Sequence, residues 1–148
     1  MEVVCTRKGT EGSNPSLSVK LMNVILSVKP KYIAQILSGS KKYEYRKTIW
    51  KTTVNKVYIY SCAPEKKIVG YFPYTSYYSG ELEQIWMKTK TLSGITKAEY
   101  DEYFRNKQNA YAIIITDFFV FDMPYDPFIN YSKFTPPQSY QYISEDIP

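Results

Sequence analysis

Short apolar runs separated by turn residues are the main pattern of this chain, and they predict strands with a few helices between them. The first run, residues 23–28 (NVILSV), predicts a buried strand because it is short and rich in β-branched residues. After Pro30, apolar residues recur on one stripe of a helix, at Tyr32, Ile33, Ile36 and Leu37. Proline favours a first helical turn and glycine the position after the last, so Pro30 and Gly39 predict a helix over residues 30–38.

Two aromatic runs in the middle of the chain predict a β-hairpin. They are residues 56–62 (KVYIYSC) and 67–74 (KIVGYFPY), and the turn residues Ala63-Pro64-Glu65-Lys66 join them. Gly70 lies inside the second run, where a glycine indicates a bulge or the close approach of another backbone.

The second half of the chain begins with two helical patterns. The first has apolar spacing at Leu82, Ile85, Trp86 and Thr89. The second, residues 95–105, starts with Thr96 and Glu99 at the spacing of a capping box. Residues 110–121 (AYAIIITDFFVF) form the most apolar run and predict one central strand.

The chain is predicted to form one domain over residues 22–143. Residues 1–21 are expected to be an unstructured leader or a mis-assigned start, and residues 144–148 a flexible tail. The proline-rich end predicts loops with a short terminal strand at Tyr140 and Tyr142. Too few helices separate the strands for a doubly wound sheet, so we expect an α+β fold, a small mixed β-barrel with peripheral helices.

The distribution of charge indicates an anionic partner. The net charge is +5, and residues 29–67 hold ten Lys or Arg against two Glu, a balance of +8. A basic face of this kind favours nucleic acid, although ordinary lysine decoration for solubility is an equal alternative. No apolar run approaches the ~20 residues that span a bilayer, and we expect a cytoplasmic protein without membrane contact.

The absence of histidine excludes several kinds of chemistry. With His 0, the chain cannot carry a Ser-His-Asp or Cys-His centre or an imidazole zinc site. Cys5 and Cys62 are too few for a thiolate site, so we expect no metal and no cofactor. Any catalysis must use Lys, Glu, Asp, Tyr, Thr or Ser.

The candidate functional residues lie in residues 39–47 (GSKKYEYRK), which follow the predicted helix. Strand alternation places Lys42, Glu44 and Arg46 on one face and Tyr43, Tyr45 and Lys47 on the other. A bend at Gly39 would bring Lys41 beside Glu44 and Arg46 at the mouth of a cleft. There Glu44 can accept from an exocyclic amine, Arg46 can hold a phosphate, and tyrosines can stack on a base. The alternative is that Glu44 and Arg46 form a purely structural ion pair.

The same residues carry a resemblance to a known family. The segment ILSVKPKYIAQILSG (residues 25–39), followed by Gly39-x-Lys41-x-x-Glu44-x-Arg46, resembles the ASCH domain family of the PUA-like superfamily. The resemblance implies a small β-barrel and a role with RNA, as an RNA-binding or coregulator module. Some members are enzymes: one branch resembles an amidohydrolase of acetylated cytidine, and ribonuclease activity is attributed to another.

This chain departs from the amidohydrolase branch at one position. There the motif lysine is followed three residues later by threonine, with a glutamate elsewhere completing the site, whereas here Lys41 is followed by Glu44. Our leading prediction is therefore a PUA-like RNA-binding module that recognises RNA or a modified nucleotide in a basic cleft. The alternatives are a small nucleoside amidohydrolase or ribonuclease that uses Lys41 and Glu44, and a protein-interaction or transcription coregulator domain. The predicted ligand-binding residues are Lys29, Lys31, Gly39, Lys41, Lys42, Glu44, Arg46 and Lys47.

Overall fold

The computed structural model describes residues 2–4, 21–130 and 133–148 of the 148-residue chain. Its elements, in chain order, are β1 (Glu2–Val4), β2 (Met22–Val28), α1 (Pro30–Ser38), β3 (Tyr43–Arg46), β4 (Val54–Ser61), β5 (Lys67–Pro73), β6 (Tyr77–Glu81), α2 (Leu82–Thr89), the 3₁₀ turn η2 (Lys90–Leu92), α3 (Lys97–Tyr103), β7 (Asn109–Ile114), β8 (Phe119–Tyr125), α4 (Pro127–Asn130) and β9 (Tyr140–Ile143). The predicted mixture of strands and helices is confirmed. None of the helices in these ranges is long and apolar enough to cross a membrane.

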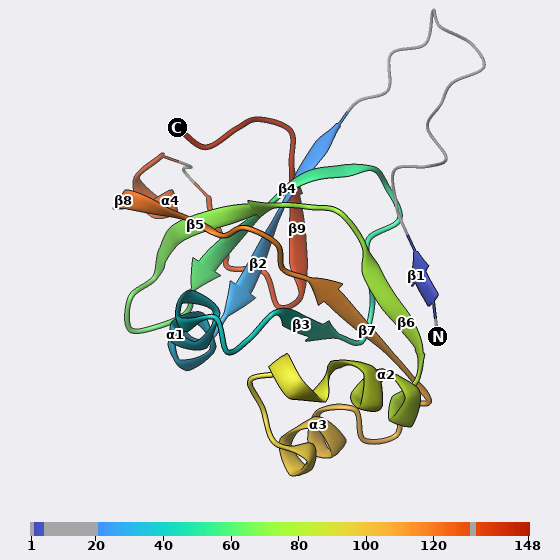
Figure 1. Ribbon diagram of the computed structural model, residues 1–148. Helices are drawn as coiled ribbons and strands as arrows, with labels where there is room; N and C mark the ends of the chain where they lie inside the picture. The colour runs from blue at the N-terminus through green and yellow to red at the C-terminus, as the bar shows by residue number, and fades with distance from the viewer. Residues whose placement is uncertain (1, 5–20, 131–132) are drawn as a thin grey trace, which may run out of the picture.

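The strands pair into two sheets. One has the order β8-β5-β4-β2-β9 and the other the order β1-β6-β7-β3. The β2 and β4 strands are parallel neighbours, and the other pairs are antiparallel. In Figure 1, α1 lies beside the end of β2, and α2 and α3 lie together on the side of β3 and β7. The closed barrel stays a prediction, because these pairings establish two sheets only.

The first helix agrees with its prediction at both ends. Pro30 is its first residue, and Gly39 follows its last with φ 87°, a left-handed conformation that glycine adopts without strain. Ser40 and Lys41 both donate backbone N–H groups to the Gln35 carbonyl, so the chain turns sharply out of α1. This turn delivers the next residues to the start of β3.

The predicted hairpin and its special glycine are confirmed. β4 and β5 are antiparallel, and their register shifts where Ile59 faces Gly70 and Tyr60 faces Ile68. A Cβ on Gly70 would collide with the Phe119 carbonyl oxygen and lie 2.9 Å from the Phe118 ring. The backbone of β8 therefore approaches β5 as closely as it does only because residue 70 has no side chain.

The prediction of one central strand over residues 110–121 is wrong. β7 ends at Ile114 and pairs with β3 and β6, whereas β8 begins at Phe119 and pairs with β5 in the other sheet. The chain therefore changes sheets at the polar pair Thr116-Asp117, which interrupts this mostly apolar run. Strand β6, which lies between the hairpin and α2, was not predicted from the sequence.

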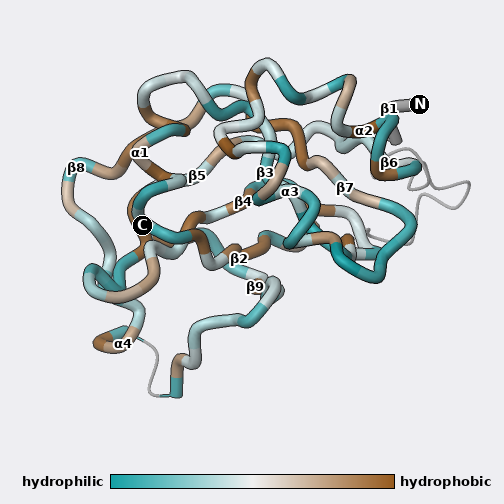
Figure 2. Tube along the Cα trace, turned by 90° about the horizontal axis from the view of Figure 1, so that it is seen from below, coloured by the Kyte–Doolittle hydropathy of each residue, from teal (hydrophilic) through white to brown (hydrophobic). Residues whose placement is uncertain are grey.

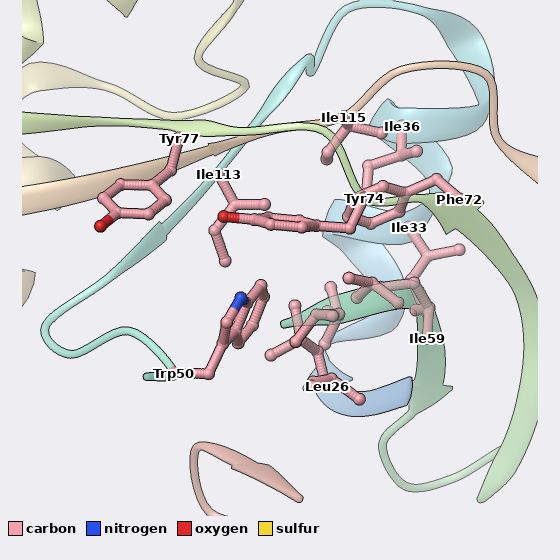
Figure 3. Close-up of a cluster of buried hydrophobic side chains, with 14 of the residues drawn as sticks. Leu26, Ile33, Ile36, Trp50, Ile59, Phe72, Tyr74, Tyr77, Ile113 and Ile115 are labelled. Carbon is pink, nitrogen blue, oxygen red and sulfur yellow. The ribbon is translucent and has the colours of Figure 1, made fainter. Parts of the chain in front are cut away.

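The main hydrophobic cluster joins residues from both sheets and α1. Figure 3 shows the Trp50 ring facing Tyr74 and Ile113, and the α1 residues Ile33 and Ile36 lie together across the cluster from Trp50. The Trp50 and Tyr74 ring centroids lie 5.0 Å apart at 73°, a favourable edge-to-face arrangement. Hydrophobic colour follows the central strands in Figure 2, with more polar turns at the periphery.

Residues near both ends of the chain contact the sheets. Glu2–Val4 pair with β6 as strand β1, which the prediction of an unstructured leader did not include. The rest of that leader, apart from Leu21, lies outside the described residues. The predicted flexible tail contacts the larger sheet: Ile147 is buried and its N–H donates to the Tyr58 hydroxyl at 3.0 Å. Asp146 also forms an ion pair with Lys56 at 3.2 Å.

Candidate functional site

A cleft of about 230 Å³ lies where the end of β2, the start of α1, β3 and α3 meet. These elements are neighbours in the lower half of Figure 1. The cleft is lined by Ser27, Val28, Lys29, Tyr32, Lys41, Glu44, Tyr45, Arg46, Ile95, Glu99 and Tyr103. Four of the eight predicted ligand-binding residues are in this set: Lys29, Lys41, Glu44 and Arg46.

Glu44 and Arg46 form an ion pair in the floor of the cleft. Arg46 Nη2 lies 2.9 Å from Glu44 Oε2, and each residue is 8% exposed. Arg46 also donates to the carbonyl of Ser27 at 2.8 Å and to that of Ser139 at 3.2 Å. Arg46 was predicted either to hold a phosphate or to pair with Glu44, and in the structure it pairs with Glu44. The guanidinium is thus committed to protein groups from three segments of the chain.

Lys41 is buried beside this pair, with 2% of its surface exposed. It lies before β3 and pairs through a single β-bridge with Ser93, in agreement with the expected bend after Gly39. Its ammonium group donates to the Ser93 carbonyl at 2.9 Å. Burial lowers the pKa of Lys41 from its ordinary value; the Glu44 carboxylate acts in the opposite direction and the Arg46 charge in the same one.

Aromatic rings surround the Lys41 ammonium. It lies 5.1 Å from the centroid of the Tyr45 ring and 5.3 Å from that of Tyr32, within the range of a cation–π contact. The Tyr45 hydroxyl is 2.6 Å from Thr89 Oγ1, and its ring packs edge-on against Tyr100 at 5.2 Å. Burial raises the pKa of Tyr45 to about 12. Tyr45 is therefore a fixed wall of the cleft.

The other predicted residues lie around the cleft or behind it. Lys31 forms an ion pair with Glu99 at 3.7 Å, and Lys47 lies 4.6 Å from the centroid of the Tyr103 ring. Gly39 and Lys42 instead line a second cavity of about 310 Å³, which also touches Lys41. The ligand-binding roles of all eight residues stay predictions.

The α3 side of the cleft was not predicted from the sequence. Ile95, Glu99 and Tyr103 come from a segment about 50 residues beyond the charged stretch, and Tyr32 comes from α1. Tyr32 was part of the apolar stripe of the predicted first helix and Glu99 part of a capping box, and both patterns indicate a helix without indicating a site. That capping box is confirmed: Glu99 N donates to Thr96 Oγ1 at 3.1 Å, and Thr96 N donates to Glu99 Oε1 at 2.8 Å. The second of these hydrogen bonds lowers the pKa of Glu99.

No metal centre is evident in the described part of the chain. Across residues 21–130 and 133–148, no three His, Cys, Asp or Glu side chains are grouped so that they could hold a metal ion. The charged groups of the cleft are a carboxylate-guanidinium pair, the ammonium groups of Lys29 and Lys41, and a second carboxylate, that of Glu99. Such a site can donate to and accept from a ligand and can stack it against tyrosines.

Comparison with known proteins identifies relatives over most of the chain. No family model matches. The large ribosomal subunit protein uL22 of Ureaplasma parvum is 32% identical over 122 residues, which are 81% of this chain and 39% of that protein. The chain thus spans about two fifths of that relative's length. An ASCH domain-containing ribonuclease of Zymomonas mobilis is 24% identical over 130 residues, covering 82% of this chain and 84% of that protein.

Comparison with solved structures also finds ASCH proteins of Zymomonas mobilis. The crystal structure of ASCH from Zymomonas mobilis superposes with a TM-score of 0.74 and 23% identity, covering 84% of this chain and 87% of that one. A variant of the same protein gives a TM-score of 0.72 and 22% identity, covering 84% and 88% of the two chains. The resemblance to ASCH domains is therefore confirmed, and this chain has the ASCH fold.

Proposed function

We propose that this chain is an RNA-binding module whose cleft accepts one nucleobase. The observation that carries the proposal is the composition of the cleft, a charged floor of Lys41 and Glu44 between tyrosine walls. A base presents hydrogen-bond donors and acceptors on its edge and a π surface on its face, and both find partners in such a site.

The individual contacts follow from the geometry of the floor. Glu44 accepts from an exocyclic amine, and Lys41 has N–H groups besides the one that reaches Ser93. Tyr32 and Tyr103 line the walls in addition to Tyr45. Stacking on such rings contributes about 1–3 kcal/mol per base.

The size of the cleft favours a single base. Its volume of about 230 Å³ is below the ~300–1,000 Å³ typical of pockets for drug-sized ligands. A duplex hides its bases in stacked pairs, so the ligand must be single-stranded, a loop or an end. The relative named as a ribonuclease adds support for an RNA partner.

A binding titration tests the proposal. Fluorescein-labelled single-stranded RNA of mixed sequence is titrated with the protein at low salt and followed by fluorescence anisotropy. We expect the affinity for RNA to fall as the salt concentration rises. We also expect Tyr103→Leu to lower the affinity about tenfold. Tyr142→Leu is the matched control, because Tyr142 is 38% exposed against 36% for Tyr103 and does not line the cleft. Absence of RNA binding, or equal effects of the two substitutions, would refute the proposal.

A second candidate function is hydrolysis of RNA or of a modified nucleoside in the same cleft. It is favoured by the lowered pKa of Lys41 beside Glu44, since a neutral amine can act as a base, and by the relative named as a ribonuclease. Lys41 would activate the nucleophile, and Glu44 would act as acid or base. Incubation with bulk RNA and with acetylated cytidine tests it: turnover that Lys41→Met abolishes supports hydrolysis, and RNA binding without turnover rejects it.

A further inference from the structure

Glu99 is held in the wall of the cleft by two separate contacts. Its Oε1 accepts from the Thr96 backbone N–H at 2.8 Å, which fixes the side chain at the first turn of α3. Its Oε2 lies 3.7 Å from Lys31 Nζ at the start of α1. Both side chains of that ion pair are well exposed, at 43% for Glu99 and 62% for Lys31, so the pair neutralises Glu99 only weakly.

The interior of the cleft is less basic than the sequence suggested. Three cations line it, Lys29, Lys41 and Arg46, but Arg46 is already matched by Glu44 at 2.9 Å. Glu99 places a second carboxylate among the lining residues. Lys29 is an exposed residue of the lining, and Lys31 and Lys47 are exposed outside the lining. The lining therefore has three cations against two carboxylates, a balance of +1, and further positive charge lies around the cleft.

We infer that Glu99 is a specificity-determining residue, which keeps phosphate out of the cleft so that the uncharged base enters it. The inference rests on the proposed function and adds to it the orientation of the nucleotide. A phosphate brought into the cleft would lie near a fixed carboxylate, and two like charges repel. The same phosphate left outside meets the exposed lysines. Glu99 thus favours a nucleotide that enters base first.

The test compares each nucleoside with its phosphorylated form. The probes are adenosine, guanosine, cytidine and uridine and their 5′-monophosphates, and their dissociation constants are measured by NMR titration at low salt. The informative variant is Glu99→Gln, because glutamine also serves at the third position of a capping box and so preserves the start of α3. We expect it to tighten monophosphate binding about three- to tenfold and to change nucleoside binding less than about twofold.

Two further variants make the test specific. Glu102→Gln removes one charge from the same helix at a residue that pairs with Arg105 at 3.0 Å and does not line the cleft. We expect it to leave the ratio of nucleoside to monophosphate affinity unchanged. Glu99→Gln in a Lys31→Gln background separates the loss of the Glu99 charge from the release of Lys31, and the gain for monophosphates should persist there.

The possible results distinguish the role of Glu99 from RNA binding itself. If Glu99→Gln leaves the affinity ratio unchanged, if Glu102→Gln changes it equally, or if the gain disappears in the Lys31→Gln background, the role of Glu99 is refuted while RNA binding stands. If the wild-type protein binds neither the nucleosides, nor the monophosphates, nor single-stranded RNA, the proposed function itself is refuted, and the role of Glu99 with it.

Discussion

Arg46 Nη2 lies 2.9 Å from Glu44 Oε2, and the two side chains are 9% and 11% exposed. The same guanidinium donates to the carbonyls of Ser27 and Ser139. One side chain therefore joins β3 to the end of β2 and to the segment before β9. In the structure, Arg46 holds the floor of the cleft together.

Arg46→Ala is expected to destabilise the protein by about 3–5 kcal/mol, because it leaves the buried Glu44 carboxylate without its partner. Urea unfolding followed by circular dichroism measures the change. The double variant Glu44→Gln/Arg46→Met should lose less stability than Arg46→Ala, because it removes both charges together.

Arg105→Ala is the control for this prediction. Arg105 also pairs with a glutamate, Glu102, at 3.0 Å, but the two side chains are 70% and 67% exposed. Its loss should cost less than about 1 kcal/mol. Equal costs for Arg46→Ala and Arg105→Ala would show that the buried pair does not stabilise the fold.

Gly70→Ala should destabilise the protein by about 1–3 kcal/mol, because the added Cβ collides with the Phe119 carbonyl oxygen. Thermal unfolding of the variant measures this cost. Gly39→Ala is a useful contrast, since a Cβ there meets nothing within 4 Å but must adopt φ 87°. We expect Gly39→Ala to destabilise the protein by about 1–2 kcal/mol. Gly39→Asn should cost about half of that or less, because asparagine tolerates the left-handed conformation better than alanine. If Gly70→Ala is neutral, β8 can move away from β5 at no cost.

The buried hydroxyl of Tyr45 should make stability fall at alkaline pH. Its pKa in the folded protein is about 12, against 10.0 as the ordinary value, so folding disfavours the phenolate. The stability that depends on the neutral Tyr45 hydroxyl is fully present below pH 10 and is lost as the pH rises from 10 through 12. Urea unfolding at several pH values between 8 and 11.5 should show a shallower alkaline decline for Tyr45→Phe than for the wild type. Parallel declines of the two proteins would contradict the assignment.

Lys41 should have the opposite dependence on pH. Burial lowers its pKa in the folded state below the ordinary value of 10.5, so the unfolded chain binds the proton more tightly. The free energy of unfolding of the wild type, relative to Lys41→Met, should therefore rise with pH in the range below 10.5. Lys107→Met reports the effect of losing an exposed ammonium outside the cleft. A wild-type advantage that stays constant or falls as the pH rises toward 10.5 would contradict the prediction.

Several features of this protein were determined by short stretches of its sequence. Pro30 and Gly39 set the two ends of α1, because proline and glycine restrict or permit specific backbone angles. Thr96 and Glu99 set the start of α3 through hydrogen bonds that span only three residues. The β4–β5 hairpin and the charged stretch that includes Lys41, Glu44 and Arg46 were also visible, since each depends on neighbours in the chain.

Other features were decided only by the tertiary structure. An apolar run such as residues 110–121 indicates burial but not which sheet buries it. The polar pair Thr116-Asp117 lies at the break between β7 and β8, but only the strand pairing shows that the two strands belong to different sheets. The cleft depends on contacts across long separations, 52 residues from Lys41 to Ser93 and 93 from Arg46 to Ser139. Local patterns fix backbone conformation because they act through adjacent residues. The meeting of Glu99 and Tyr103 with the charged stretch depends on the order of strands, which no local pattern specifies.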